Sequence, residues 1–317
     1  MADEHMNNTS TSQQDSLVIF TFFLIPTLML LSGLVVFPYP QTPMSNQWIL
    51  IPLFLGLALL GSGVLLYSRH YGHVITMIGW GLFTYFWANL PSFLYYSEGG
   101  DIFNAAVCVI GVYVLNYMGY HEWLSWKKNE EVSCLRWIAG GTFVAGTIYF
   151  LFDVGLFPAL KAGLIETVAA QSAFILQMLG FNVVRNGSII TFQQSSITII
   201  FACTAIQAMV LFIGMIIALQ TVSWKRKILT ITVTVVPIYF LNLVRNASVI
   251  YLVGSGTTSF HIAHNILAKI GALLTLIALL FLTFKLIPEL YDEIMGIMDL
   301  PKRRGPLEAL LSRILKK

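Results

Sequence analysis

Charged residues are scarce in this chain. Only 10% of its 317 residues are charged, whereas 57% are hydrophobic. A soluble globular domain carries about 25% charged residues, so this composition excludes an ordinary water-soluble protein. The net charge of +3 is small, and a nucleic-acid-binding function has no support. The composition predicts an integral membrane protein.

Cysteine is rarer still, with three residues in the whole chain. Cys108 falls inside an apolar run, Cys134 falls in a loop that we assign to the cytoplasm, and Cys203 alone reaches the outer face. A disulfide on the outer face needs two cysteines there, so none can form within the chain. Cys203 is left free to react.

Long apolar runs fill most of the chain. A transmembrane helix needs about 20 predominantly apolar residues. Eight runs meet this length, over residues 17–37, 48–68, 73–95, 102–120, 136–158, 203–221, 228–252 and 264–284. The sequence therefore predicts an all-α polytopic membrane protein with about eight transmembrane helices. We expect a disordered cytoplasmic tail over residues 1–16, one integral membrane domain over 17–285 and a basic amphipathic cytoplasmic tail over 286–317.

Lysine and arginine fall in every second loop between these runs. The cations are Arg69, Lys127, Lys128, Arg136, Lys225, Arg226, Lys227, Lys285, Lys302, Arg303 and Arg304. Short cytoplasmic loops carry the positive excess, so this alternation sets the orientation. We expect cytoplasmic termini and an outer face that carries Cys203, Arg245 and His264.

The longest outward segment, residues 159–202, is predicted to form an extracytoplasmic cap. An imperfect helical stripe ends at Gly180, and two β-rich runs flank Asn186-Gly187. Both residues tolerate positive φ, which favours a type I′ hairpin. The predicted fold thus includes a small outward helix and β-hairpin insertion before the sixth helix. A solvated loop with β-prone residues is the alternative.

Cys203 stands at the start of the sixth predicted span. Thr204 and Gln207 match the Thr-x-x-Gln capping box, which predicts that the helix begins at Thr204 with Cys203 just before it. Helix N-termini and nearby cations favour the thiolate, which is the nucleophilic form of cysteine. This position indicates a nucleophile. A small buried apolar residue is the alternative interpretation.

Arg245 is predicted at the outer end of the seventh span, which is the wrong side for a topological cation. We expect it to hydrogen-bond a substrate carbonyl, or the oxyanion that forms when this carbonyl is attacked. The alternative is an interface anchor whose charge reaches into water. Asn242 and Asn246 are its polar neighbours in the sequence.

His264, beside Asn265, suits a general acid/base that hands a proton to a leaving amine. His261 and His264 are three residues apart and would share a helical face, but no third ligand completes a metal site, so we expect no metal and no cofactor. Lys269 lies deeper in the last span. It is expected to meet a lipid phosphate or a substrate carboxylate, or to reach out to the interface.

Three segments together resemble the motifs of the exosortase/archaeosortase family. They are Phe201-Ala-Cys203-Thr-Ala-Ile-Gln207, Asn242-Leu-Val-Arg245-Asn246 and His264-Asn265, in this order. The resemblance implies an intramembrane cysteine transpeptidase in an archaeal plasma membrane. Such an enzyme cleaves a C-terminal sorting signal from exported proteins and transfers the new carboxyl end to a membrane lipid. The signal consists of a Pro-Gly-Phe type motif, a hydrophobic helix and a basic end.

The resemblance also implies roles for individual residues. Cys203 would be the nucleophile, Arg245 would stabilise the carbonyl or oxyanion, and His264 would be the third catalytic residue. Some family members have Arg at this third position, so His261 and Asn265 stay open as alternatives. The candidates for substrate binding or support are Thr204, Gln207, Asn242, Asn246, His261, Asn265 and Lys269.

Two other functions fit the apolar composition. One is a hydrolytic intramembrane protease without lipid transfer. The other, from a different class, is a secondary transporter or channel, whose polar groups normally lie near the membrane midplane. Here the polar groups cluster at one face instead, which favours the enzyme.

Overall fold

The fold is described from a computed structural model that covers residues 2–40, 47–97 and 102–315. Within these residues the chain is mostly helical and divides into two compact units. Unit 1 consists of Met1–Phe143 and Glu293–Lys317, and unit 2 consists of Val144–Asp292. The sequence predicts a single membrane domain over residues 17–285. The two units are described separately below.

Unit 1 is a group of apolar helices with the C-terminal segment packed onto it. Its elements are α1 (Ala2–Val36), α3 (Leu50–Leu65), α4 (His70–Ala88), α5 (Leu90–Ser97), α6 (Ile102–Lys128), the first part of α7 (Ser133–Asp153), the end of α12 (Pro288–Met298), η3 (Leu300–Arg303) and α13 (Pro306–Leu315). Helix α1 includes residues 2–16, for which the sequence predicts a disordered tail. Extending an existing apolar helix needs no new nucleus, which favours its continuation into this polar stretch.

The C-terminal helix α13 is anchored to α6 through Glu308. This carboxylate is 6% exposed and accepts hydrogen bonds of 2.9 Å from the hydroxyls of Tyr117 and Tyr120. His121 Nε2 lies 3.3 Å from its Oε1. Burial alone would raise the pKa of Glu308, but the contacts with His121 and the two tyrosines outweigh it and hold the pKa at about 2. The side chains at 311 and 313–317, part of the predicted amphipathic tail, lie outside the described residues.

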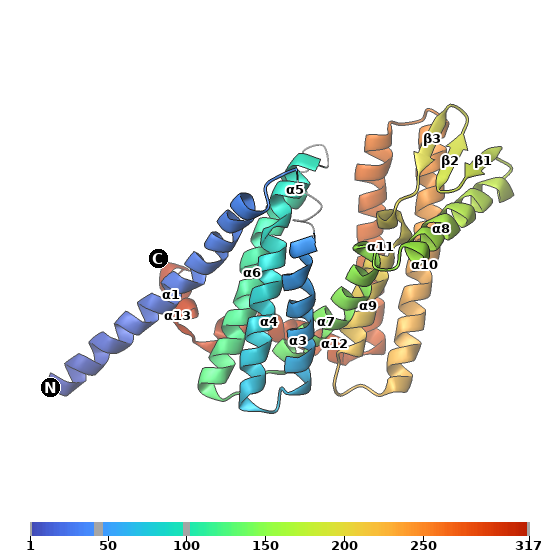
Figure 1. Ribbon diagram of the computed structural model, residues 1–317. Helices are drawn as coiled ribbons and strands as arrows, with labels where there is room; N and C mark the ends of the chain where they lie inside the picture. Colours follow the sequence, from blue (N-terminus) through green and yellow to red (C-terminus); the bar gives the residue numbers. More distant parts are fainter. Residues whose placement is uncertain (1, 41–46, 98–101, 316–317) are drawn as a thin grey trace. The chain divides into compact units, whose positions relative to one another are not determined.

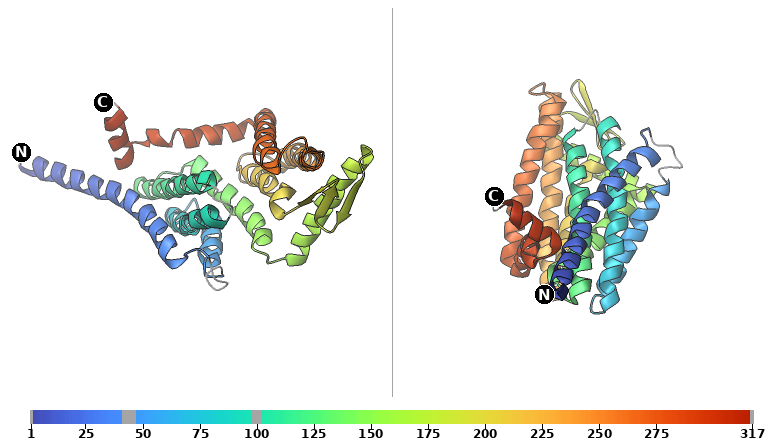
Figure 2. Two further views of the ribbon diagram at one scale, coloured as in Figure 1. Left: turned by 90° about the horizontal axis from the view of Figure 1, so that it is seen from above. Right: turned by 90° about the vertical axis from the view of Figure 1, so that its left-hand side faces the viewer.

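Unit 2 contains the helices that carry the motif residues. Its elements are the end of α7, α8 (Pro158–Met178), β1 (Val183–Asn186), β2 (Ile189–Phe192), β3 (Ser195–Thr198), η1 (Phe201–Thr204), α9 (Ile206–Ile217), α10 (Trp224–Gly254), η2 (His261–Leu267), α11 (Ala268–Leu286) and the start of α12. The strands form an antiparallel sheet in the order β1-β2-β3. The sheet lies beside α8 and near one end of α10 (Figures 1 and 2).

The first β-turn differs by one residue from the predicted type I′ turn. Asn186 pairs with Ile189, so the two turn residues are Gly187 and Ser188, and of these Gly187 has a positive φ of 59°. Asn186 belongs to β1 instead. Glycine alone supplies the positive φ here, because a residue without Cβ adopts this conformation at no steric cost.

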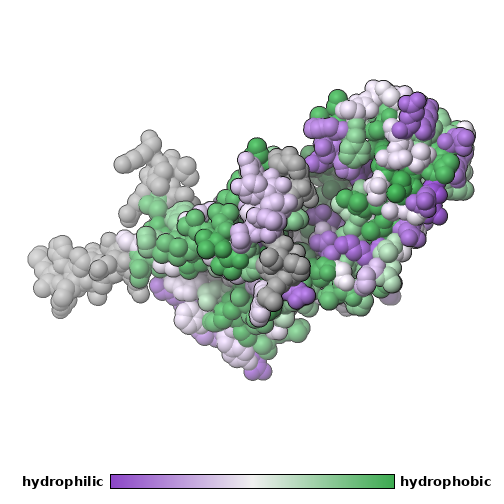
Figure 3. All heavy atoms as spheres, turned by 45° about the horizontal axis from the view of Figure 1, so that its top comes forward, coloured by the Kyte–Doolittle hydropathy of each residue, from purple (hydrophilic) through white to green (hydrophobic). Residues whose placement is uncertain are grey.

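Helix α10 is fixed at both ends. At its start, Arg226 forms a bidentate ion pair with Glu289 of α12, with N–O distances of 2.6 and 3.0 Å. At its other end, a Cβ on Gly254 would collide with Phe192 of β2, so glycine lets the sheet approach the helix. These contacts connect both ends of α10 to neighbouring elements. On the face that Figure 3 shows, hydrophilic side chains gather around the strand-bearing end of unit 2.

Six helices of the described ranges are long and apolar enough to cross a membrane. They cover Asp15–Val36, Ile102–Lys128, Ser133–Asp153, Pro158–Met178, Trp224–Gly254 and His261–Leu286. Five of them coincide with predicted spans, so the predicted count of eight is not confirmed. The predicted spans 48–68 and 203–221 correspond to the short helices Leu50–Leu65 and Ile206–Ile217. The predicted span 73–95 is divided between α4 and α5. The sixth candidate, α8, belongs to the predicted cap.

Candidate active site

Cys203 lies in a short 3₁₀ turn rather than directly before a helix. The turn η1 ends at Thr204, Ala205 adopts a left-handed conformation with φ 59°, and α9 begins at Ile206. The Thr204 hydroxyl donates backwards to the carbonyl oxygen of Phe201 at 2.7 Å. The predicted capping box of Thr204 and Gln207 is therefore wrong. The N-cap is Ala205, whose side chain has no oxygen to bind an amide.

The Cys203 side chain belongs to an apolar cluster. The residue is 8% exposed and packs with buried residues of α8, β1, β2 and α10. The cluster consists of Val168, Ala169, Ala173, Leu176, Val183, Ile190, Phe192, Ile199, Cys203, Leu243, Ala247 and Ile250. Residues of the predicted cap thus belong to the same apolar cluster as Cys203.

The Cys203 backbone is held by two asparagines of α10. Asn242 Nδ2 donates to the Cys203 carbonyl oxygen at 2.7 Å, and Asn246 Nδ2 donates to the same oxygen at 3.0 Å. Both asparagines are buried, with 8% and 5% exposure. They lie four residues apart and therefore on one face of the helix. These contacts join the first and second motifs of the sequence in space.

Arg245 lies between the two asparagines in the sequence and is partly buried. Its Nη1 donates to Asn242 Oδ1 over 3.5 Å, which is a long and weak hydrogen bond, and its Nε is buried with no protein partner. Helix α10 continues through Gly254, more than two turns beyond Arg245. The prediction that Arg245 ends its span is therefore wrong. The guanidinium keeps most of its five donors available to a ligand.

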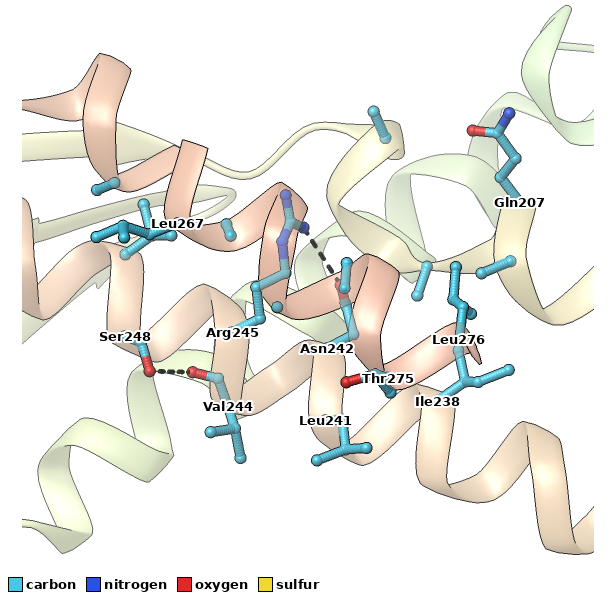
Figure 4. A pocket seen from close by; sticks show the side chains of 18 of the residues that line it. Gln207, Ile238, Leu241, Asn242, Val244, Arg245, Ser248, Leu267, Thr275 and Leu276 are labelled. Carbon is cyan, nitrogen blue, oxygen red and sulfur yellow. Dashed lines mark hydrogen bonds between the residues drawn. The ribbon is translucent and has the colours of Figure 1, made fainter. Parts of the chain in front are cut away.

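A cavity of about 630 Å³ opens beside Arg245, bounded by η1, α9, α10, η2 and α11. This volume is in the range that binds small ligands or a segment of chain. Its polar lining residues are Gln207, Asn242, Arg245, Ser248 and Thr275. Figure 4 shows Arg245 and Asn242 pointing toward one another within this cavity. Cys203 and His264 do not line it, but their chain neighbours Ala202 and Ala263 do.

His264 lies in the π-helical segment η2, which leads into α11. Its ring stacks on Phe260 with centroids 5.0 Å apart and an angle of 8° between the planes. The residue lies within electrostatic range of Arg245 and Lys269. Single π-turns occur often at functional sites. In such a turn, residues three apart no longer share a face as they do in an α-helix, which weakens the predicted pairing of His261 with His264.

The remaining candidates are more peripheral. His261, Asn265 and Lys269 are exposed and do not line the cavity, whereas Gln207 is exposed and lines it. Across the described ranges, no group of three His, Cys, Asp or Glu side chains lies close enough to hold a metal ion. Sequence reasoning missed Ser248 and Thr275. The sequence does contain a pattern that points to Thr275. It continues a series of small residues, Ala268, Gly271 and Ala272, at helical spacing in an otherwise bulky apolar helix.

Comparison with known proteins gives the same family as the motifs. The family model described as transmembrane exosortase matches residues 75–284, more than half of the chain, including Cys203, Arg245 and His264. The chain is also similar to archaeosortase A of Haloferax volcanii, with 25% identity over 269 residues that cover 73% of this chain and 86% of the relative. No solved structure matches the chain. The protein is a multi-pass membrane protein and belongs to the transmembrane exosortase family.

Proposed function

We propose that the protein is an intramembrane cysteine transpeptidase. It cleaves a C-terminal sorting signal of exported proteins, formed by a Pro-Gly-Phe type motif and a hydrophobic helix, and transfers the new carboxyl end to a membrane lipid. One observation carries the proposal. Asn242 contacts both the Cys203 carbonyl and the Arg245 guanidinium, and Asn242 and Arg245 line a cavity in the part of the chain that matches the family.

The proposed reaction has two steps. First, His264 takes the proton of the Cys203 thiol, the sulfur attacks the scissile carbonyl carbon, and Arg245 donates hydrogen bonds to the oxyanion that forms. The C–N bond then breaks, the departing amine takes a proton from His264, and a thioester remains on Cys203. Second, a lipid amine attacks the thioester carbon and gives its proton back to His264. The C–S bond then breaks, the new amide leaves with the lipid, and the proton on His264 passes to the Cys203 sulfur, which restores the thiol.

We propose that the cavity binds the apolar residues of the substrate that lie next to the scissile bond. Its lining is mainly aliphatic, with Arg245 as the charged group that would orient a carbonyl. The alternation of loop cations supports the extracytoplasmic face for this site. The similarity to archaeosortase A of Haloferax volcanii supports an archaeal plasma membrane. A substrate helix would reach it sideways from the lipid, so no large soluble domain is needed.

The test uses the full-length protein in membranes with a reporter that ends in a Pro-Gly-Phe motif, an apolar helix and basic residues. Cys203→Ala and Cys203→Ser should abolish processing, whereas both variants should insert and fold. Cys108→Ala is the matched control, since Cys108 is a buried cysteine of unit 1. Processing by Cys203→Ala at the rate of the control would refute cysteine catalysis.

Mass spectrometry of the processed reporter distinguishes the two enzyme alternatives. A carboxyl end linked to a lipid supports transpeptidation, and a free carboxyl end supports a hydrolytic protease. Neither product would form if the protein were a transporter.

We further propose that the segment 159–202 keeps water from the thioester, because a dry site lets transfer compete with hydrolysis. The support is its packing: α8 and β2 contribute to the apolar cluster around Cys203. A change that displaces the segment 159–202 should shift the product from the lipid-linked form toward the free acid. An unchanged ratio of the two products would contradict the idea.

A further inference from the structure

Two buried carboxamides converge on a single backbone oxygen at the candidate nucleophile. Asn242 and Asn246 both donate to the Cys203 carbonyl, at 2.7 and 3.0 Å. A carbonyl oxygen has two lone pairs, so the two donors saturate it. The carbonyl needs such partners, because Ala205 leaves the helical conformation immediately afterwards and a buried unpaired carbonyl costs about 1–3 kcal/mol.

These two bonds also connect two elements that carry different parts of the site. Cys203 N donates to Ile200 O at 2.9 Å and Thr204 Oγ1 donates to Phe201 O, so the other hydrogen bonds of this turn are local. In the part of the chain that the structure describes, the bonds between η1 and α10 are those from Asn242 and Asn246.

The same helical turn carries the guanidinium. Arg245 precedes Asn246 directly, and its Nη1 donates to the oxygen of the Asn242 amide whose nitrogen binds Cys203. The spacing Asn-x-x-Arg-Asn thus places two anchors for the nucleophile's backbone and the proposed oxyanion donor on one turn of a helix that is fixed at both ends.

We propose that Asn242 and Asn246 are positioning residues that hold Cys203 at a fixed distance and orientation from Arg245. This inference rests on the proposed function, since it assumes that Cys203 and Arg245 act on the same carbonyl group. The asparagines act through the Cys203 backbone and do not touch the substrate. A displacement of about 1 Å between reacting groups costs about 10²-fold in rate, so losing an anchor should lower kcat strongly.

The experiment measures kcat and KM for the reporter with full-length protein in lipid nanodiscs, together with the unfolding midpoint of each variant. Asn246→Ala should lower kcat per folded molecule by about 10²-fold and leave KM within about twofold. Asn246→Asp should be at least as damaging although it is isosteric, because a carboxylate oxygen would face the Cys203 carbonyl oxygen.

Thr234→Val is the matched control. Thr234 lies on the same helix, is fully buried and donates at 2.8 Å within α10, to Thr230 O. It should lose a comparable amount of stability and keep kcat. If Asn246→Ala does not fold, Asn246→Ser, which keeps a hydroxyl donor, replaces it with the same expectation of reduced kcat at unchanged KM.

A double-mutant cycle separates positioning from mere stability. In an Arg245→Lys background the alignment of Cys203 with the guanidinium no longer matters, so Asn246→Ala should cost much less there than in the native protein. Equal costs in both backgrounds, or a kcat that falls only in proportion to the folded fraction, would overturn the inference. Such a result leaves the proposed function standing if Cys203→Ala is inactive, whereas an active Cys203→Ala refutes the function itself.

Discussion

Replacing Arg245 with methionine separates catalysis from stability. In the structure the guanidinium has one weak bond, to Asn242 at 3.5 Å, and a buried Nε with no protein partner. The ion pairs found among the described residues do not include it. A charge that is removed from water without a counter-ion destabilises the folded state. The protein therefore keeps Arg245 at a cost in stability.

Arg245→Met should change the stability of the protein little and its kcat strongly. A weak hydrogen bond contributes less than about 1 kcal/mol, and the relief of desolvation offsets this loss, so the melting temperature should change by no more than about 2–4 °C. Removing one oxyanion donor costs about 10²–10³-fold in kcat. We expect an almost inactive protein that is as stable as the native one.

The assay combines reporter turnover in nanodiscs with thermal unfolding followed by intrinsic fluorescence. Arg185→Met is the control, because Arg185 is exposed and, among the described residues, its guanidinium bonds Gly187 O of its own hairpin. It should keep both activity and stability. The reasoning fails if Arg245→Met retains more than about a tenth of the native kcat, or if its activity falls only as far as its folded fraction.

Three further perturbations test other parts of the structure. Gly271→Leu should raise KM at least about tenfold without lowering the melting temperature, because a Cβ there meets no protein atom within 4 Å and Gly271 lines the cavity. Gly111→Leu, where a Cβ is equally free but which lies in unit 1, should leave KM unchanged. Ala205→Gly should raise the free energy of unfolding by about 1 kcal/mol, and Ala205→Val should lower it, since the left-handed conformation penalises Cβ; urea titration in detergent measures both. The depressed pKa of Glu308 stabilises the docked α13 fully above pH 4.5, and this contribution of about 3 kcal/mol is lost as the pH falls toward 2. Protease sensitivity of the C-terminus should therefore rise between pH 4.5 and 2, and Glu308→Gln should show it already at pH 7.

Hydropathy located most helices but not their ends. The apolar runs at 102–120 and 228–252 lie within α6 and α10, and the run at 264–284 lies within η2 and α11. Burial of a helix in lipid requires such a continuous apolar run. Composition does not report where a helix breaks. The predicted span 73–95 divides at Asn89, whose side-chain amide donates to the backbone carbonyl of Tyr85 one turn earlier. Helix α10 likewise passes Arg245 without a break.

The sequence identifies the candidate residues of the site, but it does not predict the hydrogen bonds that connect them. Residue types and order identified Cys203, Arg245 and His264 as candidates, and their assembly into a catalytic group stays a prediction. The capping-box prediction failed for two reasons. The Thr204 hydroxyl donates to the Phe201 carbonyl instead of accepting from a helix amide, and alanine rarely adopts the left-handed conformation that Ala205 has here. The contact between Asn242 and Cys203 spans 39 residues of sequence, beyond the reach of any local pattern.

The position of Cys203 also decides how the proposed role of the segment 159–202 in excluding water can be tested. Its side chain belongs to the apolar cluster that α8, β1 and β2 form against α10, so residues of the segment 159–202 share the buried environment of Cys203. Deleting the hairpin would remove Ile190 and Phe192 from this cluster and alter the nucleophile along with the segment. A substitution at an exposed position of the sheet, such as Val184→Asp, leaves the cluster intact while it changes the exposed surface of the sheet. The ratio of lipid-linked to free product in that variant therefore reports on the segment, whereas the same ratio after deletion reports on both.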